Sequence, residues 1–289
     1  MNHTEQRKKL RALLAGSECL IPAGVHDALS ARVAESVGYE IGLLAGSVVA
    51  TTTLAAPDLL IHTLTECADQ VRRIMCVSKL CLYLDADNGY GNALNVMRTI
   101  QECEHAGVTG LTIEDTTQPI AFGQPANELR LVSIEEGVGK MRAALAARSD
   151  PSLVIAARTP AIKLEGIESA VARAKAYAAT GVDMIHLTGA IGKPEYLQAV
   201  YAAAKLPIGV GDSHGISTRE QLAACGVRIA FVGDHPQVSA IVKALRDTYT
   251  HLFNGGAPAD LKSKIASAQE MKQLVNGESY NQLLSKYMR

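Results

Sequence analysis

Eight short apolar runs alternate with longer helical segments along most of the chain, and this alternation limits the folds open to it. The runs are residues 19–23, 41–45, 81–84, 109–113, 153–157, 184–187, 207–210 and 228–232. Most are almost continuously apolar, which is typical of parallel strands covered on both faces. The segments between them, such as 92–105, 133–148 and 165–180, have the apolar spacing of amphipathic helices. The pattern therefore predicts a series of parallel β/α units.

Eight such units favour an α/β fold with a single closed (β/α)8 barrel of the TIM type, because eight strands close around a space that side chains just fill. The chain has 289 residues, enough for one barrel of about 250 residues and an extension. Turn-forming residues at 254–258 follow the eighth predicted helix, 236–252, which we expect to complete the barrel. We assign residues 1–257 to the barrel with an N-terminal helix, and residues 258–289 to a C-terminal helical extension at a subunit interface.

The composition narrows the classes of partner. Lys and Arg number 28 against 29 Asp and Glu, so the chain lacks the basic surface that binds nucleic acid or an anionic membrane. No apolar stretch is long enough to span a bilayer, and the charged N-terminal helix does not resemble a signal peptide. The six cysteines form no CxxC pair. We expect a cytoplasmic protein that acts on a small molecule and has no structural zinc.

Polar residues follow several of the predicted strands, at the end of a barrel where active sites form. Carboxylates follow the third and fourth strands, an arginine follows the fifth, a histidine the eighth and a serine the second. These residues are Asp85, Asp87, Glu114, Arg158, His235 and Ser47. We expect them to meet at the mouth of the barrel.

The carboxylates predict a metal site. Asp85 and Asp87 are two residues apart and would point to the same side of a strand, where Glu114 from the neighbouring strand could join them. Carboxylates without nearby His or Cys suit Mg²⁺ or Mn²⁺. The alternative is that these acids cap helices or pair with cations such as Arg98. We favour the metal, because unpaired acids packed so densely would repel one another.

The remaining three residues suit a substrate that is an anion. The planar guanidinium of Arg158 can bind a carboxylate through two hydrogen bonds. A structural salt bridge to Glu114 or Asp85 is an alternative, and Arg158 could serve both purposes. His235 could donate to an anion or move a proton, and equally could cap or pack a helix. The hydroxyl of Ser47 could hold a carboxylate, but as a nucleophile it has no base that the sequence reveals.

Four motifs resemble the isocitrate lyase and phosphoenolpyruvate mutase superfamily over nearly the whole chain. They lie at residues 22–32, 85–91, 112–115 and 157–159. Within that superfamily, the segments 89–99 and 135–140 are most similar to the bacterial oxaloacetate decarboxylase family.

The resemblance implies a Mg²⁺ site in which Asp85 is the direct ligand, while Asp87, Glu114 and Asp58 act through water. It also implies that the substrate is contacted by Ser47, Arg158 and His235. We predict that Arg158 and His235 are the catalytic residues, because they would orient a substrate carboxylate and His235 could protonate the enolate. For the assembly, the resemblance implies a homotetramer whose C-terminal helices exchange between subunits.

Some positions depart from branches of the superfamily. The lyase branch carries a Lys-Lys-Cys-Gly-His segment after the fourth strand, but residues 118–124 here contain no cysteine. Asn127 and Glu128 do not replace the Lys and Asn of the mutase gating loop. Pro160 stands where the decarboxylase family usually has Asn or an acid. Residues 211–213, after the seventh strand, lack the tyrosine that the family has there.

The resemblance implies Mg²⁺-dependent decarboxylation of oxaloacetate, or a close 2-oxo dicarboxylate, to pyruvate and CO₂ through a metal-stabilised enolate. The first alternative is a carbon–carbon lyase of the 2-methylisocitrate type or a phosphonopyruvate-type mutase or hydrolase. The second is a protein that binds a 2-oxo acid without turnover.

Overall fold

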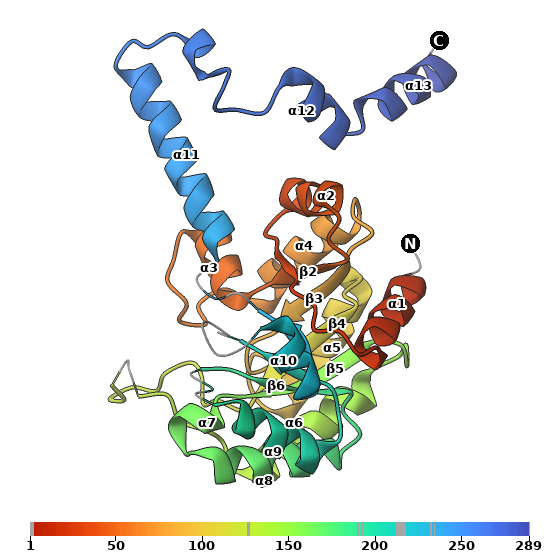
Figure 1. The fold of residues 1–289 in the computed structure, drawn as a ribbon, viewed down its shortest axis with the longest axis vertical. Coiled ribbons are helices and arrows are strands. Elements are labelled where there is room, and N and C mark those ends of the chain that lie inside the picture. Colours follow the sequence, from red (N-terminus) through yellow and green to blue (C-terminus); the bar gives the residue numbers. More distant parts are fainter. Residues whose placement is uncertain are drawn as a thin grey trace.

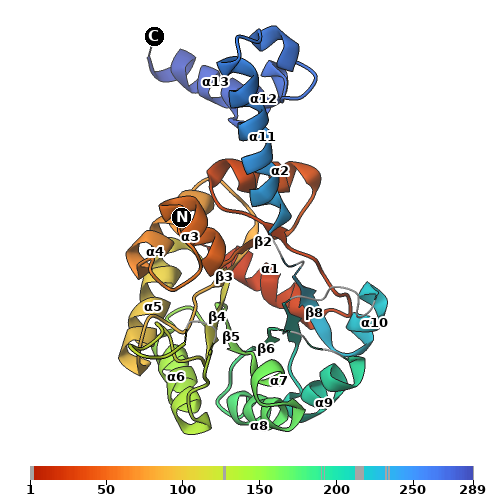
Figure 2. The same cartoon turned by 90° about the vertical axis from the view of Figure 1, so that its left-hand side faces the viewer.

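The strands of the protein form one curled parallel sheet (Figures 1 and 2). The computed structural model describes residues 3–125, 128–189, 191, 193–211, 218–231, 233 and 235–288. Within these residues eight strands pair in chain order, each with the next. The strands are β1 (Ala23–Gly24), β2 (Ile41–Leu44), β3 (Cys81–Asp85), β4 (Gly110–Glu114), β5 (Val154–Thr159), β6 (Met184–Leu187), β7 (Ile208–Val210) and β8 (Val227–Ala230). The predicted TIM-type fold is confirmed.

The first and last strands are joined by a single parallel bridge between Leu20 and Ile229. The amide of Leu20 donates to the carbonyl of Arg228, and the amide of Ala230 donates to the carbonyl of Leu20, both at 2.9 Å. β1 is shorter than the predicted run 19–23, because Pro22 has no N–H to donate to a ladder. The curled sheet is thus closed by fewer hydrogen bonds here than elsewhere.

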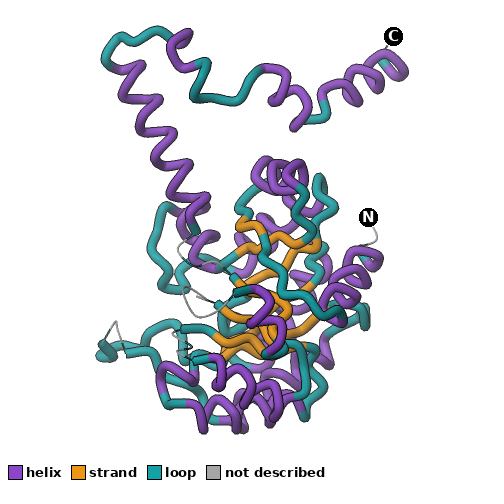
Figure 3. Tube along the Cα trace, in the orientation of Figure 1, coloured by secondary structure: helices purple, strands orange, loops and turns teal. Residues whose placement is uncertain are grey.

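Helices surround the strands in the tube view (Figure 3). The predicted helices 92–105, 133–148 and 165–180 correspond to α5, α6 and α8, with slightly different ends. The helices are α1 (Thr4–Ala15), α2 (Ala28–Val37), α3 (Gly46–Leu54), α4 (Leu64–Met75), α5 (Ala93–Ala106), α6 (Ile134–Ala147), α7 (Ala161–Leu164), α8 (Ile167–Ala178), α9 (Pro194–Ala204), α10 (Arg219–Ala224), α11 (Pro236–Phe253), α12 (Ala268–Leu274) and α13 (Gly277–Tyr287), with a 3-10 turn at Pro258–Leu261. None of the described helices combines the length and apolar composition needed to cross a bilayer.

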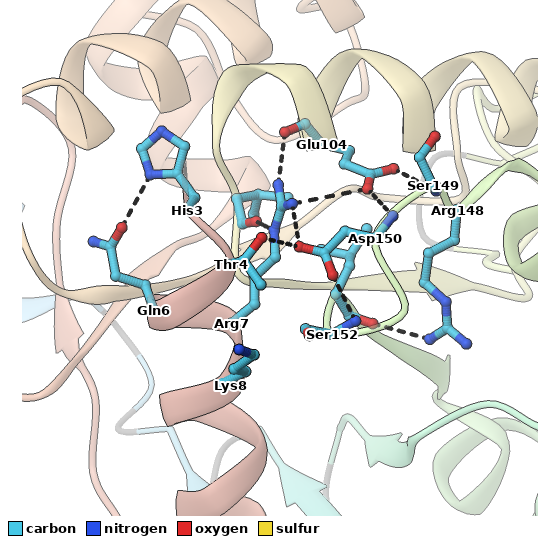
Figure 4. Close-up of polar contacts among 12 residues, drawn as sticks. His3, Thr4, Gln6, Arg7, Lys8, Glu104, Arg148, Ser149, Asp150 and Ser152 are labelled. Atoms are coloured by element: carbon cyan, nitrogen blue, oxygen red, sulfur yellow. Dashed lines mark hydrogen bonds and ion pairs between the residues drawn. The ribbon is translucent and has the colours of Figure 1, made fainter. Parts of the chain in front are cut away.

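The N-terminal helix α1 covers the end of the barrel at which the strands begin. Arg7 donates to the carbonyls of Val108 and Glu104 and pairs with Asp150 at 2.9 Å (Figure 4). Arg11 donates to the carbonyl of Ser152, just before β5. These carbonyls lie close to the first residues of β4 and β5, so α1 is fixed over the strand starts. The opposite end, where the strands finish, is left for the functional site.

The last helix of the predicted barrel, α11, does not cover the strands. It leads away from them to α12 and α13, and none of its 18 residues, all described, is buried (Figures 1 and 2). Its apolar side chains, among them Val242, Tyr249 and Phe253, are exposed. The predicted helix 236–252 is present as α11, but only Val238, near its start, packs partly buried against the core, and the rest of its apolar stripe is left uncovered by this chain. The C-terminal helical extension is confirmed, whereas the division between 1–257 and 258–289 stays a prediction.

Candidate active site

A cavity of about 210 Å³ opens at the carboxyl ends of the strands. It is smaller than the roughly 300–1,000 Å³ of pockets that hold drug-sized ligands, which suits a small molecule. Its lining includes four of the residues expected from the sequence, together with Asp58; these are Ser47, Asp85, Arg158 and His235. The other two, Asp87 and Glu114, are buried beside it. The structure thus brings the predicted set together at one end of the barrel.

Arg158 lies between two carboxylates at the ends of neighbouring strands. The register of β4 and β5 sets Glu114 opposite Arg158, and the Nη2 of Arg158 is 3.1 Å from Glu114 Oε2. The Nη1 of the same guanidinium contacts Asp85 Oδ1. The salt bridges considered from the sequence are therefore present. Arg98 pairs with Glu102 on α5 at 2.7 Å, so the alternative that it neutralises the acids of the mouth was wrong.

Negative charge exceeds positive charge in this cluster. Burial raises the pKa of Glu114 to about 7, although Arg158 acts against the shift. Burial likewise raises the pKa of Asp87 to about 6, although His62 acts against this shift. Burial opposes ionisation of Asp85 as well, but the charge of Arg158 outweighs it and lowers the pKa of that carboxyl. Near pH 7, Asp85 and Asp87 are therefore mostly ionised, whereas Glu114 is only partly so.

The donor atoms of this cluster fit a hard divalent cation. They are carboxylate oxygens, partly withdrawn from water, and a divalent cation would supply the missing positive charge. Within the described residues, no group of three His, Cys, Asp or Glu side chains is placed to hold a metal ion. The geometry suits a cation that keeps water ligands, such as Mg²⁺, better than a site built wholly from protein ligands.

Ser47 and His235 meet at the cavity from distant parts of the chain. Ser47 lies in the first turn of α3, and its Oγ is 3.1 Å from the Nε2 of His235. His235 precedes α11 and has a left-handed backbone with φ +42°, an uncommon conformation for a residue other than glycine. The sequence revealed no base for Ser47, whereas the structure places an imidazole beside it. The pair can hold an anion and pass a proton.

Aromatic rings in the barrel interior were missed from the sequence. Tyr83, His186 and Phe231 line the cavity, and the rings of His186 and Phe231 stack with centroids 4.8 Å apart at 13°. Burial lowers the pKa of His186 to about 3, and the charge of Arg158 adds to this effect. The ring is therefore neutral near pH 7. His186 was hidden because it lies within an apolar run, and only its inward register along β6 could have revealed it.

Other positions noted in the sequence have simpler outcomes. Pro160 directly follows β5 and precedes α7, where its carbonyl accepts hydrogen bonds from Lys163 and Leu164. Gly211 lines the cavity. Asp212, Ser213 and Asn127 lie outside the described residues.

The fold and this site define the class of protein: a TIM-type barrel enzyme with an acid–arginine cluster at its mouth. Residues 10–253 match the family model described as phosphoenolpyruvate phosphomutase. The chain belongs to this family, within the phosphoenolpyruvate mutase and isocitrate lyase superfamily, as its motifs predicted.

Relatives and solved structures agree with this assignment. The chain is 47% identical over 270 residues to an oxaloacetate decarboxylase of Bradyrhizobium diazoefficiens, covering 93% of this chain and 92% of the relative. It is 46% identical to an oxaloacetate decarboxylase of Rhodopseudomonas palustris, covering 94% and 93%. Phosphonopyruvate hydrolase in complex with oxalate and Mg²⁺ has a TM-score of 0.86 at 28% identity, covering all of both chains. Oxaloacetate acetylhydrolase with 3,3-difluorooxalacetate has a TM-score of 0.83 at 27% identity, covering 98% and 97%.

Proposed function

We propose that the protein decarboxylates oxaloacetate, or a close 2-oxo dicarboxylate, to pyruvate and CO₂ with Mg²⁺ as its cofactor and Mn²⁺ as an alternative. The observation that carries the proposal is Arg158, held between Asp85 and Glu114 at the edge of a small cavity that Ser47 and His235 also line. The names of the relatives at 46–47% identity support the same substrate.

The carboxylates have the role of holding the cation. Asp85 would be its direct ligand, and Asp87, Glu114 and Asp58 would hold its water ligands. When bound, the cation acts as a Lewis acid that stabilises negative charge on the 2-oxo oxygen by several kcal/mol. The ion pairs from Arg158 keep Asp85 ionised and therefore ready to bind.

The substrate is oriented by hydrogen-bond donors of the chain. Arg158 and His235 would orient the carboxylate that is lost, and Ser47 would donate to a substrate carboxylate beside His235. Decarboxylation breaks the C3–C4 bond, releases CO₂ and leaves the electron pair in the enolate of pyruvate. His235 or a water molecule then delivers a proton to C3. No covalent bond to the protein is required.

The test is turnover on a panel of acids. Oxaloacetate, 2-methylisocitrate and phosphonopyruvate are each incubated with purified protein, in Mg²⁺ or in excess EDTA, and the products are identified. We expect pyruvate and CO₂ from oxaloacetate in Mg²⁺ alone. Cleavage of either other acid in preference would favour the lyase or phosphonopyruvate alternative. Tight binding of oxalate without turnover of any acid would favour a binding protein.

We also propose that the subunits form a homotetramer through their C-terminal helices. The exposed apolar side chains of α11 and a groove of about 740 Å³ between α2 and α11 support this proposal. Sedimentation velocity on the full-length protein tests it. A monomer at micromolar concentration would refute it.

A further inference from the structure

His62 is a buried histidine outside the residue set expected from the sequence. It lies between α3 and α4, and only 2% of its surface is exposed. Its Nε2 is 3.3 Å from the Oδ2 of Asp87 and 3.0 Å from the hydroxyl oxygen of Tyr90. The rings of His62 and Tyr90 meet edge to face, with centroids 5.7 Å apart at 85°.

The carboxylate of Asp87 is confined from two sides. On one side is the His62 ring, which faces Oδ2. On the other is Gly46, where an added Cβ would lie only 2.7 Å from Oδ1. The backbone of Asp87 is left-handed, with φ +49°, and so is that of Tyr90, with φ +59°. Positive φ is unfavourable for a residue other than glycine, so contacts with neighbouring segments must stabilise the turn that contains Asp87 and Tyr90.

His62 is itself fixed by a chain of buried contacts. Tyr90 lies near Cys67, which is fully buried on α4, and burial raises the pKa of both side chains. The Nε2 of His62 forms a hydrogen bond with the hydroxyl of Tyr90, and it lies 3.3 Å from the Oδ2 of Asp87, a buried carboxylate oxygen that has no hydrogen-bond partner among the described residues. Buried side chains therefore occupy the space between α4 and the Asp87 carboxylate, and His62 is the one whose ring faces that carboxylate.

We propose that His62 is a positioning residue that fixes the carboxylate of Asp87 for the water ligands of the bound cation. This inference rests on the proposed function, because Asp87 holds a cation only if the site takes one. Groups that orient the direct ligands of a metal typically change its affinity by about 10- to 100-fold. Because Asp87 would hold water ligands of the cation and is not itself the direct ligand, we expect an effect at the lower end of this range.

The test uses two amide substitutions that differ by one methylene group. In His62→Gln the side-chain amide nitrogen can occupy the position of Nε2 and still offer an N–H to Asp87. In His62→Asn the shorter side chain does not reach that position. His105→Asn, an exposed histidine in the last turn of α5, is the matched control. Binding of Mn²⁺, without substrate, is followed by the electron paramagnetic resonance signal of the free ion. Circular dichroism and a melting curve report whether each variant is folded.

We expect His62→Asn to weaken Mn²⁺ binding about 10-fold or more, and His62→Gln and His105→Asn to stay within about threefold of the wild type. Folded His62→Asn that binds as tightly as the wild type overturns the inference. So does His62→Gln that binds as weakly as His62→Asn, since the donor would then not matter. If His62→Asn does not fold, Tyr90→Phe takes its place, because it removes only the hydroxyl that supports His62. Unchanged Mn²⁺ affinity in folded Tyr90→Phe then overturns the inference.

These outcomes separate this inference from the proposed function. A wild type that binds no Mn²⁺ refutes the metal site and the role of His62 together. A wild type that binds Mn²⁺ and decarboxylates oxaloacetate, with His62→Asn unchanged, refutes the role of His62 alone.

Discussion

Replacing Glu114 with glutamine should stabilise the metal-free protein at alkaline pH. Burial raises the pKa of Glu114 from its ordinary value of 4.5 to about 7, so the fold favours the neutral carboxyl. Between these two values the folded protein binds more protons than the unfolded chain, and the stability present below pH 4.5 is lost as the pH rises through 7. Glutamine has nearly the same shape and cannot ionise.

The expected gain follows from the same pKa difference. At about 1.4 kcal/mol per pKa unit, an ionised Glu114 costs the fold about 3 kcal/mol at pH 8 and less than about 1 kcal/mol at pH 5. Glu114→Gln should therefore raise the free energy of unfolding by about 3 kcal/mol at pH 8. The side chain is only 8% exposed, so solvent screening changes this figure little.

Urea unfolding of the wild type and Glu114→Gln in EDTA, at pH 5 and pH 8, measures the effect. Adding Mg²⁺ at pH 8 should stabilise the wild type more than the variant, because the cation favours the ionised carboxylate. Equal stability of the two proteins in EDTA at pH 8, or a less stable variant, would refute the reasoning. Either result would mean that the ion pair with Arg158, or other contacts, compensates for the burial of the ionised carboxylate.

Three further substitutions test separate parts of the structure. Asp85→Ala should lower Mg²⁺-dependent turnover of oxaloacetate by about 1,000-fold or more while the far-UV circular dichroism stays unchanged; wild-type turnover would contradict the proposed mechanism. Ser47→Ala removes the hydroxyl 3.1 Å from His235 and should raise KM by about 2- to 12-fold, equal to one hydrogen bond, in steady-state kinetics. An unchanged KM would exclude Ser47 from binding. Gly137→Ala sets a Cβ 2.3 Å from the buried hydroxyl of Tyr177 and should cost about 1–3 kcal/mol in thermal unfolding, so an unchanged melting temperature would show that the ring moves freely.

The sequence predicted the parts of the fold that depend on local pattern. The run 184–187 is the strand Met184–Leu187, because a buried parallel strand is uniformly apolar. The run 19–23 was too long, since Pro22 interrupts the ladder. The eighth helix has the predicted bounds to within a residue, but most of it lies away from the strands. The apolar stripe of this helix predicts that the helix packs against an apolar surface. It does not reveal whether that surface belongs to the same chain or to another subunit.

Some residues of the candidate site could likewise be predicted from the sequence, and others could not. Asp85, Glu114 and Arg158 were found because strand ends converge in a barrel, which is a property of topology. The pairing of Ser47 with His235 was not, because the two residues are 188 positions apart and the contact depends on the turn before α11. His62 lies in a segment without periodicity, and only the folded path of residues 55–63 brings it to Asp87.

Because α1 is fixed at the strand starts, residues at the mouth of the barrel can change during evolution without disturbing it. Its arginines bind backbone carbonyls near the first residues of β4 and β5, so its hold does not depend on which side chains the strands carry. Mutations in the loops at the mouth therefore leave the contacts of α1 with the strand starts intact. A chain built in this way can acquire a new substrate without first acquiring a new fold. Solved relatives at 26–29% identity, which bear the names of hydrolases, mutases and lyases, fit such a history.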